Sequence, residues 1–230
     1  MAESFLFRRR PGASWTVSAP VGRRKGRTVD SDLAESLSAL KESFSRRGLR
    51  ASFGKGDPEL VTQLRKQLRI PRRVREFLSE ADPLDVETRM PSERVRLVPS
   101  SELVKEQIGF ALQESGERRD DPTPQGWRPS WVIVAHSTLL GDPYFLDVSS
   151  PDAEGDCPVY TAMRATESWK PRLCASSFAL FLRILALGME LGEGFGEDDL
   201  DMDDEQVFRD AFGPRIRQYD PAALKAGHWT

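Results

Sequence analysis

The chain has 230 residues, of which 39% are apolar and 30% are charged, and its formal net charge is −3. These values are ordinary for a globular protein and predict one domain, or one domain with extensions. Two cysteines are too few for a disulfide scaffold and fit a reducing compartment, so we expect a cytoplasmic protein without a signal peptide. The most apolar window, residues 173–192, contains Arg183 and Glu190, which argues against a membrane span.

Positive and negative charges are unevenly distributed along the chain. Residues 1–75 contain 18 Lys or Arg against 7 Asp or Glu, whereas residues 76–230 contain 15 against 29. This asymmetry bears on partners rather than on the fold. Residues 1–29 carry seven basic side chains interrupted by Pro and Gly, which predicts a flexible or surface-bound arm. A nucleic-acid-binding arm and an organelle transit segment are the alternatives.

Three helices are predicted in the first third of the chain. Asp30 or Asp32 can cap the first helix, and Asp57 caps the second, with Pro58 at its first position. A Pro after Ile70 separates the second helix from a third, which ends near Asp82. The apolar stripe of the first helix consists of Leu33, Leu37, Leu40 and Phe44.

The middle of the chain predicts a small antiparallel sheet. Residues 131–135, 144–148 and 158–161 are short β-branched or aromatic runs joined by polar turns, and residues 94–98 look like another strand. In the second run Tyr144 and Leu146 lie on one face and Phe145 on the other. Such strands need helices to cover one face. A helix capped by Ser100 or Ser101 and continuing to Leu112 is expected before the sheet.

The region after the sheet predicts a buried helix, an acidic loop and a short helix. Ser176 or Ser177 can cap the apolar helix. Residues 197–205 then hold seven carboxylates in nine positions, which predicts a loop, and residues 207–212 suggest one more short helix before a tail.

The order of these segments resembles the SUKH superfamily. The resemblance covers roughly residues 54–188. It is carried by the helix from Asp57, the Ile70–Pro71 junction, a second helix ending in Phe77–Leu78, the hairpin around Gly141–Asp142, and a closing helix that begins Ser-Phe at Ser177. Where the family often has a Gly-rich turn, this chain has Ala81-Asp82-Pro83-Leu84, and the loop from Glu114 to Arg128 is longer than usual.

The resemblance implies an α+β fold in which a small twisted, mainly antiparallel sheet is backed by helices. We expect a basic N-terminal extension with one helix at residues 1–53, a SUKH-like domain at 54–190, and an acidic loop with a C-terminal extension at 191–230. Bacterial members of the family are mostly immunity proteins that neutralise a secreted toxin, often a nuclease or deaminase, and fungal members regulate cell-wall synthesis. The family supplies no catalytic residues to transfer.

The residues themselves give no pattern typical of an enzyme. His136, His228, Cys157 and Cys174 lack the close spacing of zinc ligands, and His136 is expected in a loop or on the surface. Cys174 is expected to pack as a small hydrophobe rather than act as a nucleophile. We expect Asp142 to form a turn and Asp147 to be exposed, which is a simpler interpretation than an acid–base pair. The sequence contains no Gly-rich phosphate loop. We expect no catalysis, no metal and no cofactor.

The acidic run is the main candidate partner-binding site. A solvated loop is the simplest interpretation, but a carboxylate cluster could also occupy the phosphate-binding patch of a nuclease and speed association. Phe195, Phe208 and Phe212 could supply an apolar anchor. The run could instead fold back on the basic residues of 1–75. The candidate residues are Glu197, Asp198, Asp199, Asp201, Asp203, Asp204 and Glu205, together with Asp142 and Tyr144 of the hairpin.

The sequence therefore leads to the hypothesis of a cytoplasmic, non-catalytic immunity protein whose partner is a cognate toxin. The alternatives are an interaction or regulatory adaptor of the same fold, and a nucleic-acid-binding protein that uses the basic arm. We expect no membrane association and regard nucleic acid as the weaker partner hypothesis. Both a monomer and a homodimer fit the sequence.

Overall fold

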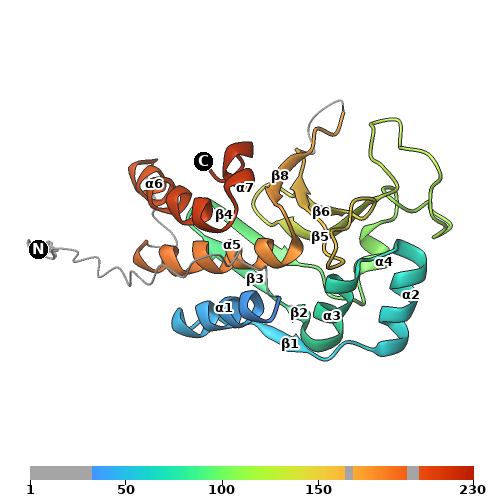
Figure 1. Ribbon diagram of the computed structural model, residues 1–230, viewed down its shortest axis with the longest axis horizontal. Coiled ribbons are helices and arrows are strands. Elements are labelled where there is room, and N and C mark those ends of the chain that lie inside the picture. Colours follow the sequence, from blue (N-terminus) through green and yellow to red (C-terminus); the bar gives the residue numbers. More distant parts are fainter. Residues whose placement is uncertain (1–32, 164–167, 196–201) are drawn as a thin grey trace, which may run out of the picture. The chain divides into compact units, whose positions relative to one another are not determined.

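The computed structural model describes residues 33–163, 168–195 and 202–230, so the predicted N-terminal arm lies outside the described residues. Within them, one six-stranded antiparallel sheet has the order β3-β4-β5-β6-β7-β8, and two strands form a small sheet, β1-β2. The fold is α+β, as predicted (Figure 1). The strands are β1 Ser52–Gly54, β2 Asp82–Asp85, β3 Glu87–Met90, β4 Glu93–Leu97, β5 Trp131–Ser137, β6 Pro143–Asp147, β7 Val159–Thr161 and β8 Arg172–Ala175.

The centre of the large sheet follows the predicted strands. β4, β5, β6 and β7 coincide with the four apolar runs identified in the sequence, and β5 and β6 pair in the expected hairpin. Residues 82–84, at the place where the family often has a Gly-rich turn, belong to β2, and Pro83 pairs with Phe53 of β1. Pro is tolerated there because a two-stranded sheet leaves one side of each strand unpaired.

Both faces of the central strands β5 and β6 are buried. Val132, Tyr144 and Leu146 belong to the main core, on the side of the helices. Phe145 and Trp131 point to the other face, where they pack with Trp127 in a second apolar cluster. Segments outside the strands cover this second face, because Phe110 and Trp169 pack against the same cluster. The predicted two-sided pattern of β6 is therefore confirmed, and neither side is left to solvent.

Helix α5 is the centre of the helical layer, with α1 and α6 packed against it (Figure 1). Its sequence is apolar on nearly every side, which explains this position. Ser177 caps it by accepting a hydrogen bond from the Leu180 amide at 3.1 Å, as predicted. The helices are α1 Leu33–Arg46, α2 Pro58–Leu68, α3 Arg72–Ala81, α4 Leu103–Glu106, α5 Phe178–Leu191, the 3₁₀ turn η1 Gly192–Gly194, α6 Met202–Tyr219 and α7 Pro221–Ala226.

The caps of the early helices follow the sequence in part. Asp57 accepts a hydrogen bond from the Glu59 amide at 2.8 Å, and Pro58 begins α2 as predicted. Asp30 and Asp32, the expected caps of α1, lie outside the described residues. The domain boundaries at 53/54 and 190/191 stay predictions.

The helix predicted from Ser100 to Leu112 is wrong in length and in its cap. α4 has only four residues, and Ser100 instead donates its amide to Asp82 at 2.8 Å. Gly109 adopts φ +84°, a conformation incompatible with a continuing helix. Gln107 directly follows α4 and is buried against β5. Its side chain donates to the Ile133 carbonyl at 3.0 Å and accepts from the Ile133 amide at 2.9 Å.

The C-terminal region is more helical than predicted. Instead of a short helix and a tail, α6 continues for 18 residues through Pro214, and α7 follows, capped by Asp220. Pro inside a helix normally costs several kcal/mol. Here Phe208, Phe212 and Ile216, each four residues apart, are buried in the main core, and this burial offsets the lost hydrogen bond.

Candidate functional site

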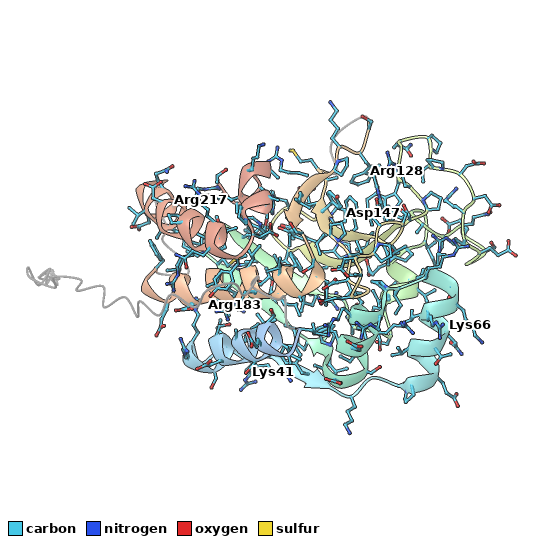
Figure 2. The ribbon with its side chains drawn as sticks, viewed as in Figure 1. Lys41, Lys66, Arg128, Asp147, Arg183 and Arg217 are labelled. Carbon is cyan, nitrogen blue, oxygen red and sulfur yellow. The ribbon has the colours of Figure 1, made fainter. Side chains whose placement is uncertain are left out.

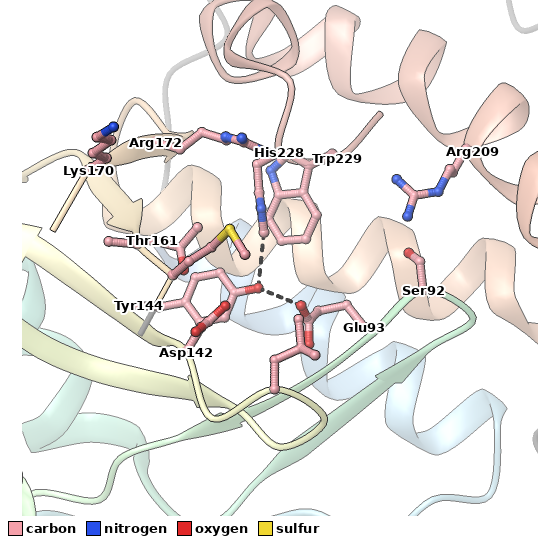
Figure 3. A pocket seen from close by; sticks show the side chains of 13 residues that line it. Ser92, Glu93, Asp142, Tyr144, Thr161, Lys170, Arg172, Arg209, His228 and Trp229 are labelled. Carbon is pink, nitrogen blue, oxygen red and sulfur yellow. Dashed lines mark hydrogen bonds between the residues drawn. The ribbon is translucent and has the colours of Figure 1, made fainter. Parts of the chain in front are cut away.

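One edge of the large sheet gathers the candidate site. Because neighbouring strands are antiparallel, the beginnings of β4, β6 and β8 meet the ends of β5 and β7 at this edge. α6 and the residues after α7 border it, and between them lies a pocket of about 340 Å³ (Figure 3). The pocket is lined by Ser92, Glu93, Leu140, Asp142, Tyr144, Thr161, Ala162, Met163, Lys170, Arg172, Arg209, His228 and Trp229.

A hydrogen-bond network forms the inner wall of this pocket. The hydroxyls of Ser137 and Tyr144 donate to the two oxygens of Glu93, at 2.7 and 3.1 Å. The Arg94 amide also donates to Glu93, at 2.9 Å. Nε2 of His228 lies 3.0 Å from the Tyr144 hydroxyl, which has one proton and gives it to Glu93. His228 therefore donates to Tyr144 through Nε2–H.

The C-terminal residues are fixed on the sheet by a second contact. The indole nitrogen of Trp229 donates to the carbonyl oxygen of Cys174, in β8, at 2.8 Å. The Trp229 ring also stacks on Tyr144, with ring centres 6.4 Å apart. The last residues of the chain thus complete the pocket wall.

The ionisable groups of the network have shifted pKa values. Burial raises the pKa of Glu93, and nearby Asp142 acts in the same direction, whereas the hydrogen bonds from Ser137, Tyr144 and Arg94 oppose the shift. Burial, and then the charge of Glu93, raise the pKa of Tyr144 well above its ordinary value. Burial lowers the pKa of His228 to about 4, aided by the nearby charges of Arg172 and Arg209. Tyr144 and His228 are therefore both neutral near pH 7.

The two thiols are poorly suited to nucleophilic chemistry. Both cysteines are buried and unpaired with each other. Burial raises the pKa of Cys157 to about 12 and that of Cys174 well above its ordinary value. The thiolate is the reactive form of cysteine, so both side chains serve as small apolar core residues, as predicted for Cys174.

Charged and apolar side chains surround the pocket mouth. Lys170, Arg172 and Arg209 bring positive charge from two segments, and Asp142 brings negative charge. The apolar side chains at this edge are unusually exposed for their size: Leu139 is 53% exposed, Leu140 71% and Met163 60%. Leu139 and Leu140 belong to the β5–β6 turn, and Met163 follows β7. The edge therefore combines a polar pocket with an exposed apolar border.

Two of the predicted partner-binding residues, Asp142 and Tyr144, lie in this pocket. Tyr144 is buried, so its contribution is the hydroxyl and not an exposed ring. Glu205 connects the acidic segment to the same region, because its carboxylate accepts from Arg209 at 2.7 Å and Arg209 lines the pocket. Asp204 is exposed on the first turn of α6.

Part of the acidic-loop prediction is corrected. Residues 202–205 form the start of α6 and not a loop, because the buried residues Phe208 and Phe212 hold this helix against the core. Glu197, Asp198, Asp199 and Asp201 lie outside the described residues, as does the side chain of Asp203. Phe208 and Phe212 were expected as apolar anchors for a partner, but they are fully buried and thus inaccessible.

His136 is also placed differently from the prediction. It belongs to β5 and is half-buried, and its Nε2 lies 2.8 Å from the Glu106 carboxylate. Asp147 is half-buried rather than exposed, and it accepts from the Ser149 amide at 3.1 Å. Its role in the turn after β6 agrees with the structural interpretation of this carboxylate.

Sequence reasoning missed Glu93 and His228. Glu93 had a detectable signal, since it alternates with Val95 and Leu97 and must share their buried face. His228 had none, because its partner Tyr144 is 84 residues away in the sequence. Lys170 precedes β8 and Arg172 begins it, and β8 was not predicted as a strand because its three apolar residues run directly into the segment of α5.

The chain was compared with protein-family models and with curated proteins. No protein-family model matches the chain, and no significant match was found among curated proteins. In the described part of the chain, no three His, Cys, Asp or Glu side chains are grouped so that they could hold a metal ion. Within the same residues, no helix is both long and apolar enough to cross a membrane.

Proposed function

We propose that this protein is a non-catalytic immunity protein that acts in the cytoplasm by binding and neutralising a cognate secreted toxin, a nuclease or a deaminase. Two facts support the proposal. The segments that resemble the SUKH superfamily fold into one α+β arrangement of the kind the resemblance implies. The sheet edge around the pocket also has the composition of a protein-binding surface. Both a monomer and a homodimer are compatible with this function.

The observation that carries the proposal is the exposure of Leu139, Leu140 and Met163 at one sheet edge. Single exposed apolar residues are common and need no explanation. Three large ones beside a pocket with polar walls resemble the centre of a protein interface, where apolar anchors are surrounded by polar groups. This border is our candidate for the toxin contact.

The acidic segment supplies the second part of the proposal. Asp204 and Glu205 lie at the start of α6, and Glu205 is joined to the pocket through Arg209. Negative charge beside an apolar anchor accelerates association with a basic partner such as a nuclease. Neutralising Asp198, Asp199, Asp201, Asp203 and Asp204 should therefore lower the association rate and its dependence on salt.

Protection of growth tests this function. The toxin encoded beside the gene is expressed in a host cell, with and without the protein, and binding of the two purified proteins is measured at low and high salt. We expect rescued growth and a stoichiometric complex that salt weakens. Failure to bind or protect against any neighbouring toxin contradicts the proposal.

Binding and growth measurements also distinguish the two alternative functions. If the protein binds a single housekeeping protein, and if the host grows normally when this binding is lost, the result supports a regulatory adaptor instead. Salt-steep DNA or RNA binding that disappears on deletion of residues 1–29 supports the nucleic-acid hypothesis. In that case neutralising the acidic residues should strengthen binding, which is the opposite of the effect expected with a toxin.

A further inference from the structure

The pocket at the sheet edge is electrically polarised. Arg172 and Arg209 impose a positive potential on His228, since both help to lower its pKa. Asp142 imposes a negative potential on the opposite wall, since it helps to raise the pKa of both Glu93 and Tyr144. Arg172 and Asp142 therefore bring opposite charges to the neutral Tyr144–His228 pair, while Arg209 lies on the side of Ser92 and Glu93 and is paired with Glu205.

The strand order explains this separation. Glu93 begins β4 and Asp142 precedes β6, whereas Arg172 begins β8 and Lys170 lies just before it. β7 lies between β6 and β8, so their backbones are roughly 10 Å apart at the spacing of neighbouring strands. Figure 3 shows Lys170 and Arg172 above the Tyr144 ring, Asp142 at its lower part and Glu93 to its right, with Arg209 farther to the right above Ser92.

The hydrogen bonds within the protein do not use every acceptor position of Glu93 or every donor of Arg172. Glu93 accepts three hydrogen bonds, from Ser137, Tyr144 and the Arg94 amide, and a carboxylate has about four acceptor positions. At the other end, the guanidinium of Arg172 has a long contact of 3.4 Å with the Gly227 carbonyl. Lys170 is exposed and makes no ion pair within the described residues.

The space between the charged ends is largely apolar. Leu140, Met163 and Trp229 line it, and its volume of about 340 Å³ falls within the range of about 300–1,000 Å³ of small-molecule sites. An apolar body with one positive and one negative group would match these walls. A purely anionic or purely cationic ligand would satisfy one end and meet repulsion at the other.

We propose that this pocket binds a small zwitterion with an apolar body, of the size of an apolar amino acid or dipeptide. The ammonium group lies toward Glu93 and Asp142, the carboxylate contacts Lys170 and Arg172, and the apolar body packs between Leu140 and Trp229. The pocket shares Leu140 and Met163 with the proposed toxin contact. Its test does not depend on the toxin, because it uses the isolated protein.

Calorimetric titration with four matched compounds tests the proposal. L-phenylalanine and glycyl-L-phenylalanine carry both charges, 3-phenylpropanoate carries only the carboxylate, and 2-phenylethylamine carries only the ammonium. We expect at least one zwitterion to bind at least about tenfold more tightly than either singly charged compound. The wide strand separation favours the dipeptide over the amino acid. Equal affinity for 3-phenylpropanoate and the zwitterions, or no binding of any compound, overturns the proposal.

Charge-neutral variants assign the two ends. Lys170→Gln should weaken binding of the zwitterion and of 3-phenylpropanoate about fivefold without weakening 2-phenylethylamine. Asp142→Asn should weaken binding of the zwitterion and of 2-phenylethylamine about fivefold without weakening 3-phenylpropanoate. The controls are Lys66→Gln on α2 (Figure 2) and Asp85→Asn on β2, both exposed and outside the pocket. Thermal unfolding establishes that each variant is folded. Equal effects of pocket and control variants contradict the assignment.

Discussion

The hydroxyl of Tyr144 lies 3.1 Å from Oε2 of Glu93, although β5 separates the strands on which the two residues lie. This side-chain bond therefore crosses over a strand at the edge of the sheet. The Nε2 atom of His228 reaches the same hydroxyl at 3.0 Å, which adds the C-terminal segment to the contact. One buried phenol thus joins three parts of the chain that are distant in sequence.

Removal of this hydroxyl should destabilise the fold. Tyr144→Phe leaves buried Glu93 without one of its three donors, and such a loss costs roughly 1–3 kcal/mol of unfolding free energy. The pKa of Glu93 should rise further. The control is Tyr160→Phe on β7, whose hydroxyl has no hydrogen bond within the described residues. Urea denaturation measures both, and equal losses would contradict a specific role for the Tyr144 network.

Stability should decline as pH falls from about 6.5 to about 4 because of His228. Its pKa is lowered to about 4 in the folded protein, so the unfolded chain, with an ordinary value of 6.5, binds the proton first. The stabilisation is complete above pH 6.5 and lost as pH approaches 4. A shift of this size corresponds to about 3 kcal/mol.

Comparison with His228→Gln isolates this contribution. Burial raises the pKa of Glu93 and Asp156. Their contribution to the free energy of unfolding therefore increases as pH falls, whereas that of His228 decreases. They are present in both proteins and cancel in the difference. The stability difference between the wild type and His228→Gln should fall across this pH window. A constant difference from pH 7 to pH 4 would show that the His228 pKa is not lowered.

The crowding around Gly188 of α5 should make its alanine variant unstable. A Cβ on Gly188 would lie 2.1 Å from the sulfur of Met90 and 3.2 Å from the Phe212 ring, so the core must repack at a cost of about 1–3 kcal/mol. Gly213 of α6 is the comparison, since apart from its chain neighbours the nearest atom, on Leu224, lies at an ordinary 3.5 Å. Pro214 follows Gly213 and disfavours the helical backbone of a residue with a Cβ, which offsets the gain from reduced backbone freedom in Gly213→Ala. A loss of stability in thermal unfolding that is no larger for Gly188→Ala than for Gly213→Ala would refute this account of α5 packing.

Asp156 should be among the most sensitive carboxylates in the chain. Although buried, it accepts hydrogen bonds from the amides of Cys157, Phe178 and Ala179, at 2.7, 2.9 and 3.1 Å. The last two amides belong to the first turn of α5, where negative charge is also favourable. Asp156→Ala should lower the unfolding free energy by about 3 kcal/mol, since three buried donors lose their partner. Asp85→Ala, at an exposed site, should change it by less than about 0.5 kcal/mol.

Local patterns predicted the parts of the fold that are specified locally. The cap at Asp57, the cap at Ser177 and the apolar runs of β5 and β6 each lie within a few neighbouring residues, and each is present in the structure. Asp142 and Tyr144 were found for the same reason, since they belong to the predicted hairpin.

Features that depend on distant contacts were not predictable in this way. α6 continues through Pro214 because Phe208, Phe212 and Ile216 pack in the core, which no helix propensity indicates. The short strand β8 forms because β7 offers it a pairing edge. The pocket itself requires His228 to meet Tyr144, and only the completed fold brings them together.

The most direct test of the central claim is the affinity of the Leu140→Ser variant for the neighbouring toxin. Leu140 is 71% exposed at the pocket border, and Leu84, at 52% exposure on β2, is a matched control that does not line the pocket. We predict that Leu140→Ser weakens the complex at least about tenfold, as expected of an apolar anchor, whereas Leu84→Ser has no effect. Unchanged affinity of Leu140→Ser, with the protein folded, would contradict the proposed binding edge.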